Sequence, residues 1–548
     1  MVTAQSITIR FVKNNFIIIS LWFLSGLAGS FLNVFIPVSI GKFYELVLHT
    51  NSAKGKLFET IGIQLQSLDS FFIFFLLIII LRSLFLFLQQ FLTSLVNETF
   101  TRDLREMMFE HQLRQTLSSF RTKPAGDYIL RYSGDMSSVQ KLIGNGIISF
   151  ASDLFFLIIA LTLLSFIQLK VTLVITLAIL IGSILYYLLA RLLIPAASER
   201  RSKKAKLISF ISERLNSFFT IKAFNRETPE TNSFKKKSLA HFEKSRRFRL
   251  LNALNQSLIP VLFFGLLGVS LFYISYLKEH RQLHLQNGEV VTYVLLILYL
   301  QSPFKRVLKV SSIWHDASVS FSKILTLLNS EIEIRKNETF AEKRIDKIIF
   351  ENVSFGYPDS EDVIRNFNFQ FQKGNIYILK GNQGTGKSTL LKLILMLYEP
   401  RTGHINLGSN SYSDLGPFNV RKKVTLVSDE APLIGSSVFE AISYSSREDQ
   451  SEKSLDTLKK FEFALPTEMM DLNFKLTHAA ANISKGQRTI LSIARALNTG
   501  KKIILLDEPF VNLDAKVESG LISLLNEMKD QFIIIIAAHQ LPKDILAD

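Results

Sequence analysis

Apolar and polar residues are distributed in two different ways along this chain. Before about residue 310, long runs of Phe, Leu, Ile and Val alternate with polar stretches, whereas the rest of the chain mixes the two kinds. Each long run is near or above the about 20 residues that a helix needs to cross a bilayer. The pattern predicts six membrane-spanning helices, at about Phe16–Ile40, Phe71–Leu95, Ile147–Leu169, Val171–Leu193, Leu254–Leu277 and Val290–Leu308.

The charge distribution favours a membrane over a nucleic acid, although the formal net charge is +16. Between Arg191 and Arg249, 16 Lys and Arg residues stand against 5 Asp and Glu, in a segment that separates two apolar runs. Cytoplasmic segments of membrane proteins carry such an excess. We therefore predict a multi-pass protein of the cell inner or plasma membrane, with both chain ends on the cytoplasmic side and no nucleic-acid partner.

The polar flanks of the spans keep the composition of helices. Glu199–Lys206 and Phe234–Arg249 contain good helix formers with few Gly or Pro residues. We expect spans two to five to continue beyond the bilayer as amphipathic helices.

Overall composition supports a membrane half and excludes cysteine chemistry. Hydrophobic residues make up 48% of the chain, Phe occurs 46 times, and the mean hydropathy is +0.25. A soluble protein is rarely so apolar. Because there are no cysteines, disulfides, thiolate catalysis and cysteine-ligated metal sites are excluded.

Arg82 lies near the middle of the second predicted span. A charge at that depth is costly, so one interpretation is a functional residue that faces a polar cavity. The alternative is an arginine that extends toward the interface or pairs with a neighbour. The sequence leaves both readings open.

The C-terminal part begins after a helical stretch at Val310–Leu328 and a polar segment at residues 329–343. Lys347–Phe355 then alternates between apolar and polar residues, which predicts a strand. We predict a transmembrane domain at residues 1–328, a linker at 329–343 and a second domain at 344–548.

The second domain contains a phosphate-binding loop. An apolar strand at Ile376–Leu379 is followed by Gly381-Asn382-Gln383-Gly384-Thr385-Gly386-Lys387-Ser388-Thr389 and then by a helical run. The glycines let backbone N–H groups turn toward phosphate oxygens, the lysine adds a cation for the β- and γ-phosphates, and the Ser388 hydroxyl can ligate Mg²⁺. This spacing between strand and helix predicts a binding site for a nucleoside triphosphate.

Two later apolar strands end in residues that suit hydrolysis. Ile503–Leu506 leads into Asp507 and Glu508, and Phe532–Ile536 is followed by His539. Asp507 suits Mg²⁺ binding through water, and Glu508 suits polarisation of a water that attacks the γ-phosphate. An acidic pair or a histidine after a strand is often only structural, but with a phosphate loop the functional interpretation is favoured.

A further segment, Ser484-Lys485-Gly486-Gln487, lies between the phosphate loop and the acidic pair and precedes a helical run. With Leu506-Asp507-Glu508-Pro509 it completes an ordered set of motifs, and the chain resembles a half-size ABC exporter over nearly its whole length. The resemblance implies a membrane all-α six-helix domain followed by an α/β P-loop ATPase domain. It also implies ATP and Mg²⁺ as cofactors, and a second copy of the chain or a paralogous half-transporter as partner.

The same resemblance assigns roles to residues outside the phosphate loop. Tyr357 would stack on adenine, Glu508 would be the catalytic base, and His539 would be the switch histidine. Ser484, Lys485, Gly486 and Gln487 would form the signature loop that completes the ATP site of the other subunit. Turns near Leu117–Arg121 and Phe218–Arg226 would contact the ATPase domain.

Two residues depart from the family pattern. Lys485 stands where the signature usually has glycine, and Asp429 stands where a glutamine is expected after the Val424–Val427 strand. Asp429 could ligate Mg²⁺ directly. The Ser428-Asp429 pair also gives a weak hint of the bacterial cyclic-peptide exporters.

Three functions therefore remain to be weighed. The first is an ATP-hydrolysing exporter of a peptide, lipid or amphipathic small molecule by alternating access. The second is a catalytically weak subunit of a heterodimer, which Lys485 and Asp429 favour and the intact Lys387, Glu508 and His539 oppose. The third, an ABC ATPase without transport activity, is disfavoured by the six spans.

Overall fold

The computed structural model describes residues 3–47, 67–123, 125–279, 287–335, 346–358, 360–382, 384–444, 450–477 and 480–539. The chain divides into two compact units, and each is described by itself. The helical unit comprises Met1–Glu110 and Pro124–Asn329, and the sheet unit comprises His111–Lys123 and Ser330–Asp548. The domain bounds expected from the sequence stay a prediction.

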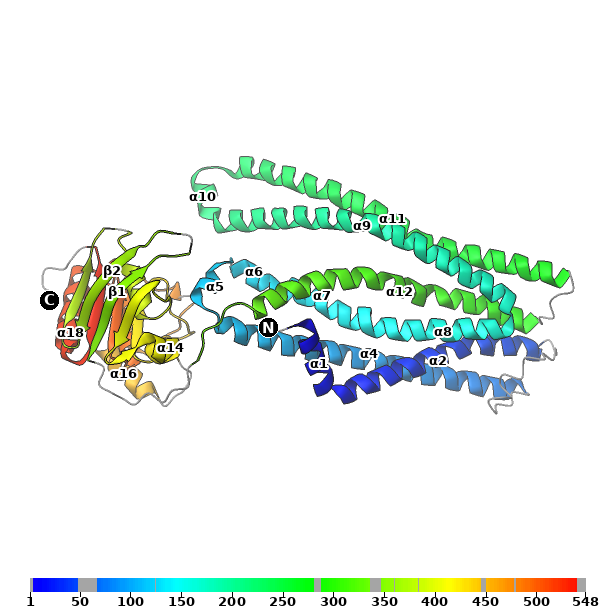
Figure 1. Cartoon of the computed structure of the whole chain (residues 1–548), viewed down its shortest axis with the longest axis horizontal. Helices are drawn as coiled ribbons and strands as arrows, with labels where there is room; N and C mark the ends of the chain where they lie inside the picture. The colour runs from blue at the N-terminus through cyan, green and yellow to red at the C-terminus, as the bar shows by residue number, and fades with distance from the viewer. Residues whose placement is uncertain are drawn as a thin grey trace. The chain divides into compact units, whose positions relative to one another are not determined.

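Long helices build the helical unit (Figure 1). They are α2 (Phe16–Val47), α4 (Leu68–Leu113), α8 (Ser149–Ile167), α9 (Leu169–Asn216), α11 (Glu227–Glu279) and α12 (Asn287–Leu328). Shorter elements are α1 (Ala4–Asn14), α6 (Ala125–Leu130), α7 (Met136–Lys141), α10 (Phe218–Ala223) and the π-helical turns η1 (Arg131–Asp135) and η2 (Leu142–Ile148). Within the described residues, six helical stretches are long and apolar enough to cross a membrane, which confirms the predicted number of spans, whereas their bounds stay a prediction.

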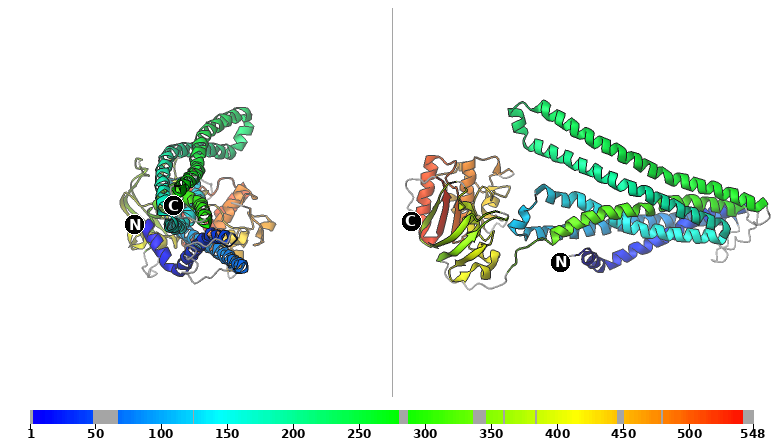
Figure 2. Two further views of the ribbon diagram at one scale, coloured as in Figure 1. Left: turned by 90° about the vertical axis from the view of Figure 1, so that its right-hand side faces the viewer. Right: turned by 45° about the horizontal axis from the view of Figure 1, so that its top comes forward.

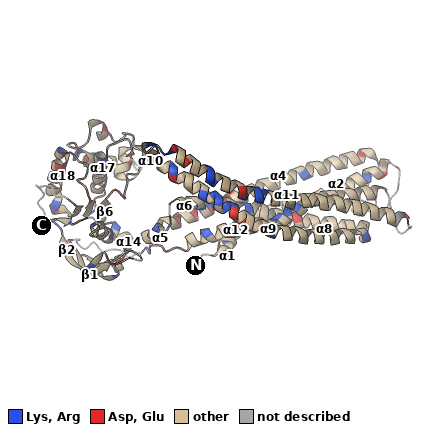
Figure 3. Ribbon diagram, turned by 90° about the horizontal axis from the view of Figure 1, so that it is seen from above, with Lys and Arg blue, Asp and Glu red and all other residues tan. Residues whose placement is uncertain are grey.

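Helices α9 and α11 continue far beyond the predicted spans. They pack along each other as an antiparallel pair joined by α10 (Figure 2). Lys and Arg residues are frequent on this pair (Figure 3). Lys244 Nζ lies 2.7 Å from Glu199 Oε2, and Arg214 Nε lies 2.8 Å from Glu230 Oε2, so ion pairs join the two helices among the basic residues. The helical flanks expected at Glu199–Lys206 and Phe234–Arg249 lie within this pair.

The helical unit packs around two apolar clusters. One joins α8, α9, α11 and α12 and includes the buried Phe156, Phe263 and Tyr293. The other joins α1, α2, α4, α7 and α12 and includes Trp22 and Met108. Many large apolar side chains stay exposed on the outside of these helices, as on Ile73, Phe87, Leu177 and Phe272. A lipid environment would cover such surfaces, which water would not tolerate over this extent.

The sheet unit contains two four-stranded sheets. An antiparallel sheet has the order β2-β1-β4-β5, from β1 (Lys347–Phe355), β2 (Ile364–Gln372), β4 (Thr402–Leu407) and β5 (Asn410–Ser411). A parallel sheet has the order β3-β8-β7-β6, from β3 (Ile376–Lys380), β6 (Val424–Val427), β7 (Ile503–Asp507) and β8 (Ile533–Ala538). The helices are α5 (Leu117–Arg121), α13 (Lys387–Ile394), α14 (Tyr412–Arg421), α15 (Val438–Ser443), α16 (Ser451–Lys459), α17 (Lys485–Asn498) and α18 (Ala515–Met528).

The parallel sheet is buried on both faces, because its central strands alternate between two cores. Ile504, Leu506, Ile534 and Ile536 point into a core formed with α15, α16, α17 and α18. Their neighbours Ile503, Leu505, Ile533 and Ile535 point into the core formed with α13, α14 and β1. Strands covered on both faces read as continuous apolar runs. This explains why β7 and β8 could be located from the sequence.

Candidate functional site

The candidate residues come together because four strands end at one edge of the parallel sheet. The phosphate loop follows β3, His539 follows β8, Glu508 follows β7, and Ser428 follows β6. Since these strands are parallel neighbours, their carboxyl ends lie side by side. That edge is the usual ligand site of such sheets.

The phosphate loop turns sharply between β3 and α13. Gly384 and Gly386 adopt φ of 87° and 92°, a left-handed conformation that favours glycine. Lys387 Nζ donates hydrogen bonds to the carbonyl oxygens of Gly381 at 2.7 Å and Asn382 at 3.0 Å. The ammonium group is therefore held at the loop, next to the N-terminus of α13. Gln383 lies outside the described residues.

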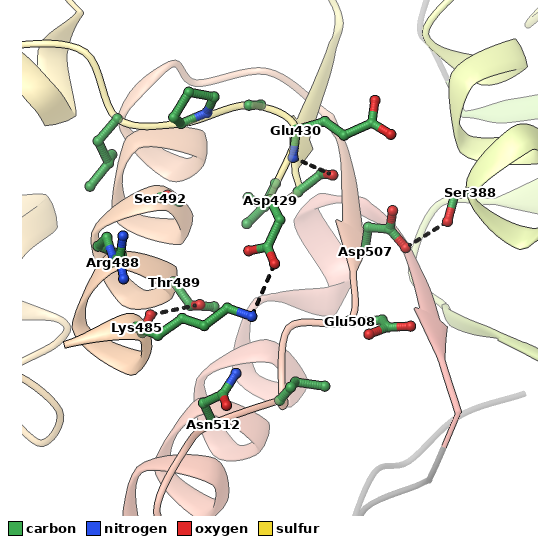
Figure 4. A pocket seen from close by; sticks show the side chains of 16 residues that line it. Ser388, Asp429, Glu430, Lys485, Arg488, Thr489, Ser492, Asp507, Glu508 and Asn512 are labelled. Atoms are coloured by element: carbon green, nitrogen blue, oxygen red, sulfur yellow. Dashed lines mark hydrogen bonds and ion pairs between the residues drawn. The ribbon is translucent and has the colours of Figure 1, made fainter. Parts of the chain in front are cut away.

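Ser388 and Asp507 lie together on one side of a cavity of about 520 Å³ (Figure 4). Ser388 Oγ donates a hydrogen bond to Asp507 Oδ1 over 3.1 Å. Burial raises the pKa of Asp507, and the neighbouring Glu508 carboxylate acts in the same direction against the Ser388 hydrogen bond. A partly desolvated carboxylate beside a hydroxyl is a suitable oxygen donor pair for Mg²⁺.

This donor pair does not form a complete metal cage. Among the described residues, no group of three or more His, Asp or Glu side chains is placed to hold a metal ion. Mg²⁺ commonly binds through one or two protein oxygens and takes its remaining ligands from phosphates and water. Ser388 and Asp507 therefore fit a metal that arrives with a nucleotide.

Glu508 and His539 face each other across the ends of β7 and β8. His539 Nε2 lies 3.2 Å from Glu508 Oε1. The backbone of Glu508 has φ of 53°, which is uncommon for a residue with a side chain, and its N–H donates to the Ala537 carbonyl over 2.8 Å. Strained conformations of this kind cluster at active sites.

Asp429 and Lys485, the two departures from the family pattern, form an ion pair with each other. Lys485 Nζ lies 3.1 Å from Asp429 Oδ2, across the cavity from Ser388 (Figure 4). Both side chains are largely solvent-exposed, at 49% and 80%, so the pair contributes little to stability. The structure thus places Asp429 beside Lys485, and its role as a metal ligand stays a prediction.

The loop after β6 is held by α17. Arg495 donates hydrogen bonds to the carbonyl oxygens of Ala431 at 2.7 Å and Pro432 at 2.9 Å. The same helix carries Lys485 in its first turn. Helix α17 therefore positions the loop that contains Asp429.

Ser484 caps α17 at the rim of the cavity. Its hydroxyl accepts a hydrogen bond from the Gln487 N–H at 3.1 Å, and Gln487 Oε1 accepts one from the Ser484 N–H at 2.9 Å. This reciprocal capping box fixes the first turn of the helix. A Cβ on Gly486 would stand 2.7 Å from the Asn512 carbonyl oxygen, so a side chain is disfavoured there. The signature-loop role of these residues stays a prediction.

Tyr357 packs beside the phosphate-loop helix. Its hydroxyl and that of Thr389 are hydrogen-bonded over 3.1 Å, and its ring meets Tyr398 edge-on at 5.4 Å between centroids. The side chain is half-buried. Contact with the helix that follows the phosphate loop is compatible with adenine stacking, which stays a prediction.

Sequence reasoning missed a charged network next to the candidate site. Glu430 Oε1 accepts a hydrogen bond from Lys392 of α13 at 2.8 Å, and Glu430 Oε2 accepts one from Arg121 of α5 at 2.7 Å. The Lys392 hydrogen bond lowers the pKa of Glu430 despite partial burial. Glu430 is adjacent to Asp429, which could have suggested it, but Arg121 lies 309 positions away.

Segment 111–123 joins the sheet unit through backbone pairing as well. The Thr116 N–H donates to the Glu331 carbonyl over 3.2 Å, and the Glu333 N–H donates to the Arg114 carbonyl over 2.7 Å. Arg421 in turn holds Glu333 with two hydrogen bonds of 2.7 Å. Helix α5, which lies where the family resemblance predicts a contact turn, is thus anchored within the sheet unit.

Two stretches of the chain match known families. Residues 19–304, more than half of the chain, match the ABC transporter transmembrane region. Residues 364–511 match the family described as ABC transporter, and this stretch contains the phosphate loop, the α17 cap and the acidic pair.

Individual relatives have low sequence identity to this chain but align with most of its length. The lactococcin-G-processing and transport ATP-binding protein LagD of Lactococcus lactis subsp. lactis is 26% identical over 84% of this chain. The matched region spans 65% of LagD, which is less than two thirds of that protein. An ATP-dependent lipid A-core flippase of Haemophilus influenzae is 23% identical over 84% of this chain and 79% of its own length.

One solved structure shares the fold over nearly the whole chain. It is a bacterial Atm1-family ABC exporter with ATP bound, with a TM-score of 0.78 and 17% sequence identity. The similarity covers 96% of this chain and 91% of that one. At this identity the likeness concerns the fold alone.

Proposed function

The chain belongs to the ABC transporter family, and from this premise we propose that it hydrolyses ATP to move a peptide, lipid or amphipathic small molecule out across the cytoplasmic membrane. The family and the fold class predicted from the sequence are confirmed. One observation carries the proposal. Lys387, Ser388, Asp507, Glu508 and His539 occupy adjacent ends of the parallel sheet, so the groups required for phosphate binding and for hydrolysis share one edge.

Phosphate binding would rest on the loop and on the first turn of α13. Backbone N–H groups at the start of that helix would donate to phosphate oxygens, with the helix dipole favouring the negative charge. Lys387 would exchange its two carbonyl acceptors for phosphate oxygens. Mg²⁺, held by Ser388 and Asp507, would neutralise phosphate charge.

Hydrolysis would rest on Glu508 and His539. Glu508 is placed to accept a proton from, or orient, an attacking water, and its contact with His539 fixes the direction of the carboxylate. His539 would in turn sense the phosphate through its ring. The strained backbone at Glu508 supports this role, because it projects the carboxylate past the end of β7.

A second nucleotide-binding domain would complete the site. The capped N-terminus of α17 is exposed, and such a terminus supplies N–H donors to an anion. We infer a dimer with a second copy or a paralogous half-transporter, in which this helix from one chain faces the phosphates bound by the other. Charge distribution supports a cytoplasmic location for the sheet unit and for both chain ends.

Coupling to the membrane helices would use α5. The short helix continues from α4 and is bound through Arg121 to Glu430, which also binds Lys392 on the phosphate-loop helix. A movement of the phosphate-loop helix would therefore reach α5 through two charge-assisted hydrogen bonds. Helix α10, at the other predicted contact turn, would also contact the ATPase domain.

The experiment that tests this function is Mg²⁺-dependent ATP hydrolysis by the purified full chain in lipid nanodiscs. We expect wild-type activity, its loss together with ATP binding in Lys387→Ala, and its retention in Lys380→Ala, which removes an exposed lysine at the end of β3. Undiminished ATP binding by Lys387→Ala would overturn the assignment of the phosphate loop. A wild-type chain that binds ATP without hydrolysing it would instead identify a paralogous partner as the source of activity.

A further inference from the structure

A polar cavity of about 670 Å³ lies inside the helical unit. It is partly open and is lined by residues of α2, α4, the η2–α8 segment and α12, which are far apart in the chain. Most of its lining residues are polar, although the helices themselves are strongly apolar. Among them are Asn33, Arg82, Thr93, Asn97, Asp153 and Arg306.

The cavity lies within the membrane-spanning part of the unit. Arg82 stands 11 positions after Phe71 and 13 positions before Leu95. At 1.5 Å per residue these are about 17 and 20 Å of helix, so Arg82 is near the middle of a hydrocarbon core of about 30 Å. The most apolar part of α4 has a mean hydropathy of 2.9. The neighbouring residues of α4 therefore offer the arginine few polar partners, which favours a functional role over a structural one.

The charges of the lining do not balance. Arg306 donates two hydrogen bonds to the buried Asp153, of 2.7 Å from Nε and 2.6 Å from Nη2, so that pair is neutral overall. Arg82 is the remaining charged residue of the lining and, within the described part of the chain, no carboxylate forms an ion pair with it. The lining therefore carries one net positive charge in a medium where an unpaired charge is expensive.

The lining also has unused hydrogen-bonding capacity. Asn33 Oδ1 and Asn97 Oδ1 are buried and have no hydrogen-bond partner among the residues that the structure describes. Buried polar atoms of this kind cost free energy unless a ligand or water satisfies them. By contrast, Gln89 Nε2 donates to Ser152 Oγ over 3.0 Å, so the amides of the cavity are not uniformly unpaired. The π-helical turn η2, which widens the helix beside the cavity, is a local form often found at functional sites.

We propose that this cavity binds the anionic group, a carboxylate or phosphate, of the transported amphiphile, with Arg82 as its counter-charge. The inference rests on the proposed export function and specifies its cargo. The anion compensates Arg82, donor groups next to it satisfy Asn33 and Asn97, and the apolar tail extends among the exposed apolar side chains of α4. Asp153 compensates the charge of Arg306, so Arg82 selects the sign of the charge.

The chain carries its own binding reporter. It has two tryptophans, Trp22 and Trp314. Trp22 is buried, and its Nε1 donates to Oγ1 of the cavity residue Thr93 over 3.0 Å. In a Trp314→Phe background, fluorescence of the full chain in nanodiscs therefore reports on the cavity without requiring ATP hydrolysis.

The experiment titrates this protein with short amphiphiles below their micellar concentrations. Octyl phosphate and octanoate are expected to change Trp22 fluorescence saturably, whereas octyl glucoside and octyltrimethylammonium are not. Arg82→Gln should weaken the anion affinity by about tenfold or more, because the counter-charge of the anion is lost. Arg82→Lys should retain part of it, and Arg191→Gln, which removes an exposed arginine of α9, should retain all of it.

Other outcomes separate the alternatives. Saturation by inorganic phosphate alone, with no gain from the octyl chain, would overturn the amphiphile and leave a free-anion site. Equal responses to octyl glucoside and octyl phosphate, or unchanged affinity in a folded Arg82→Gln protein, would overturn the inference. Anion binding by a chain that does not hydrolyse ATP would overturn the proposed function but keep the anion site. ATP hydrolysis by a chain that binds no anion would overturn the anion site but keep the proposed function.

Discussion

Two carboxylates, the buried Asp153 in the helical unit and the half-buried Asp507 in the sheet unit, are satisfied in different ways. Asp153 accepts two hydrogen bonds from the Arg306 guanidinium, so its charge is compensated within the chain. Asp507 accepts one hydrogen bond, from the neutral hydroxyl of Ser388, and has the Glu508 carboxylate as a neighbour. A carboxylate paired with arginine stabilises a fold, whereas one that is left with a hydroxyl is available to a cation.

The largest effect that this comparison predicts is on hydrolysis. Asp507→Asn should lower ATP turnover by about a hundredfold or more. The variant removes a carboxylate ligand of Mg²⁺, and the metal then neutralises the phosphate charge less effectively. Stability should be unchanged or higher, since the change removes repulsion from Glu508. ATPase rates and thermal unfolding of the purified variant measure both, with the exposed Asp530→Asn as a matched control. A fold lost along with activity would give Asp507 a structural role instead.

Asp153→Asn should have the opposite signature. It leaves Arg306 without its partner inside the membrane unit, and breaking a buried pair costs up to about 3–5 kcal/mol. Because the Arg306 side chain is 50% exposed, we expect a smaller loss of about 2 kcal/mol in the free energy of unfolding. Adding Arg306→Gln should restore most of the loss. Equal stability of the single variant and wild type would show that the pair is dispensable.

The pH dependence of Mg²⁺ use should follow from Asp507. Its pKa is raised by burial, so a larger fraction is protonated at any given pH than for an ordinary aspartate. Protons compete with the metal for this carboxylate. On acidification, the Mg²⁺ concentration needed for half-maximal hydrolysis should therefore begin to rise at a higher pH than it would with an aspartate of ordinary pKa. Without metal, the raised pKa contributes stability at low pH that is lost as pH rises through it. Titrating activity with Mg²⁺ at several pH values tests the shift, and a pH-independent Mg²⁺ requirement would contradict it.

The smallest effect should come from the exposed Asp429–Lys485 pair. A double-mutant cycle of Asp429→Asn and Lys485→Met should give a coupling free energy of unfolding below about 1 kcal/mol. Asp429→Gln should keep or raise hydrolysis if Asp429 occupies the usual glutamine position. A large loss of turnover in that variant would mean that the carboxylate binds metal itself.

The elements and motifs that could be predicted from the sequence are those formed by consecutive residues. The phosphate loop, the β7 strand with its two carboxylates and the six apolar runs each form a continuous pattern, because a helix or buried strand is specified by adjacent residues. Strand β1 was expected at Lys347–Phe355 and lies there. Parallel strands then brought separate motifs to one edge.

The features that the sequence did not predict depend on contacts between segments that are far apart in the chain. Nothing in the local pattern links Asp429 with Lys485, or Arg121 with Glu430, because each pair forms only after packing. The polar cavity is hidden for the same reason, since its residues are scattered singly over apolar helices. Only Arg82 stood out, because a single charge in a long apolar run is visible by itself.

The most direct measurement compares Glu508→Gln with wild type in the full chain in nanodiscs, recording bound ATP and hydrolysis in the same preparation. Glu527→Gln, which changes an exposed residue of α18, serves as the control. The account predicts that Glu508→Gln retains ATP in a closed dimer and hydrolyses it at a small fraction of the wild-type rate, while the control behaves as wild type. Normal turnover by Glu508→Gln would contradict the assignment of the catalytic base and, with it, the proposed site of ATP hydrolysis.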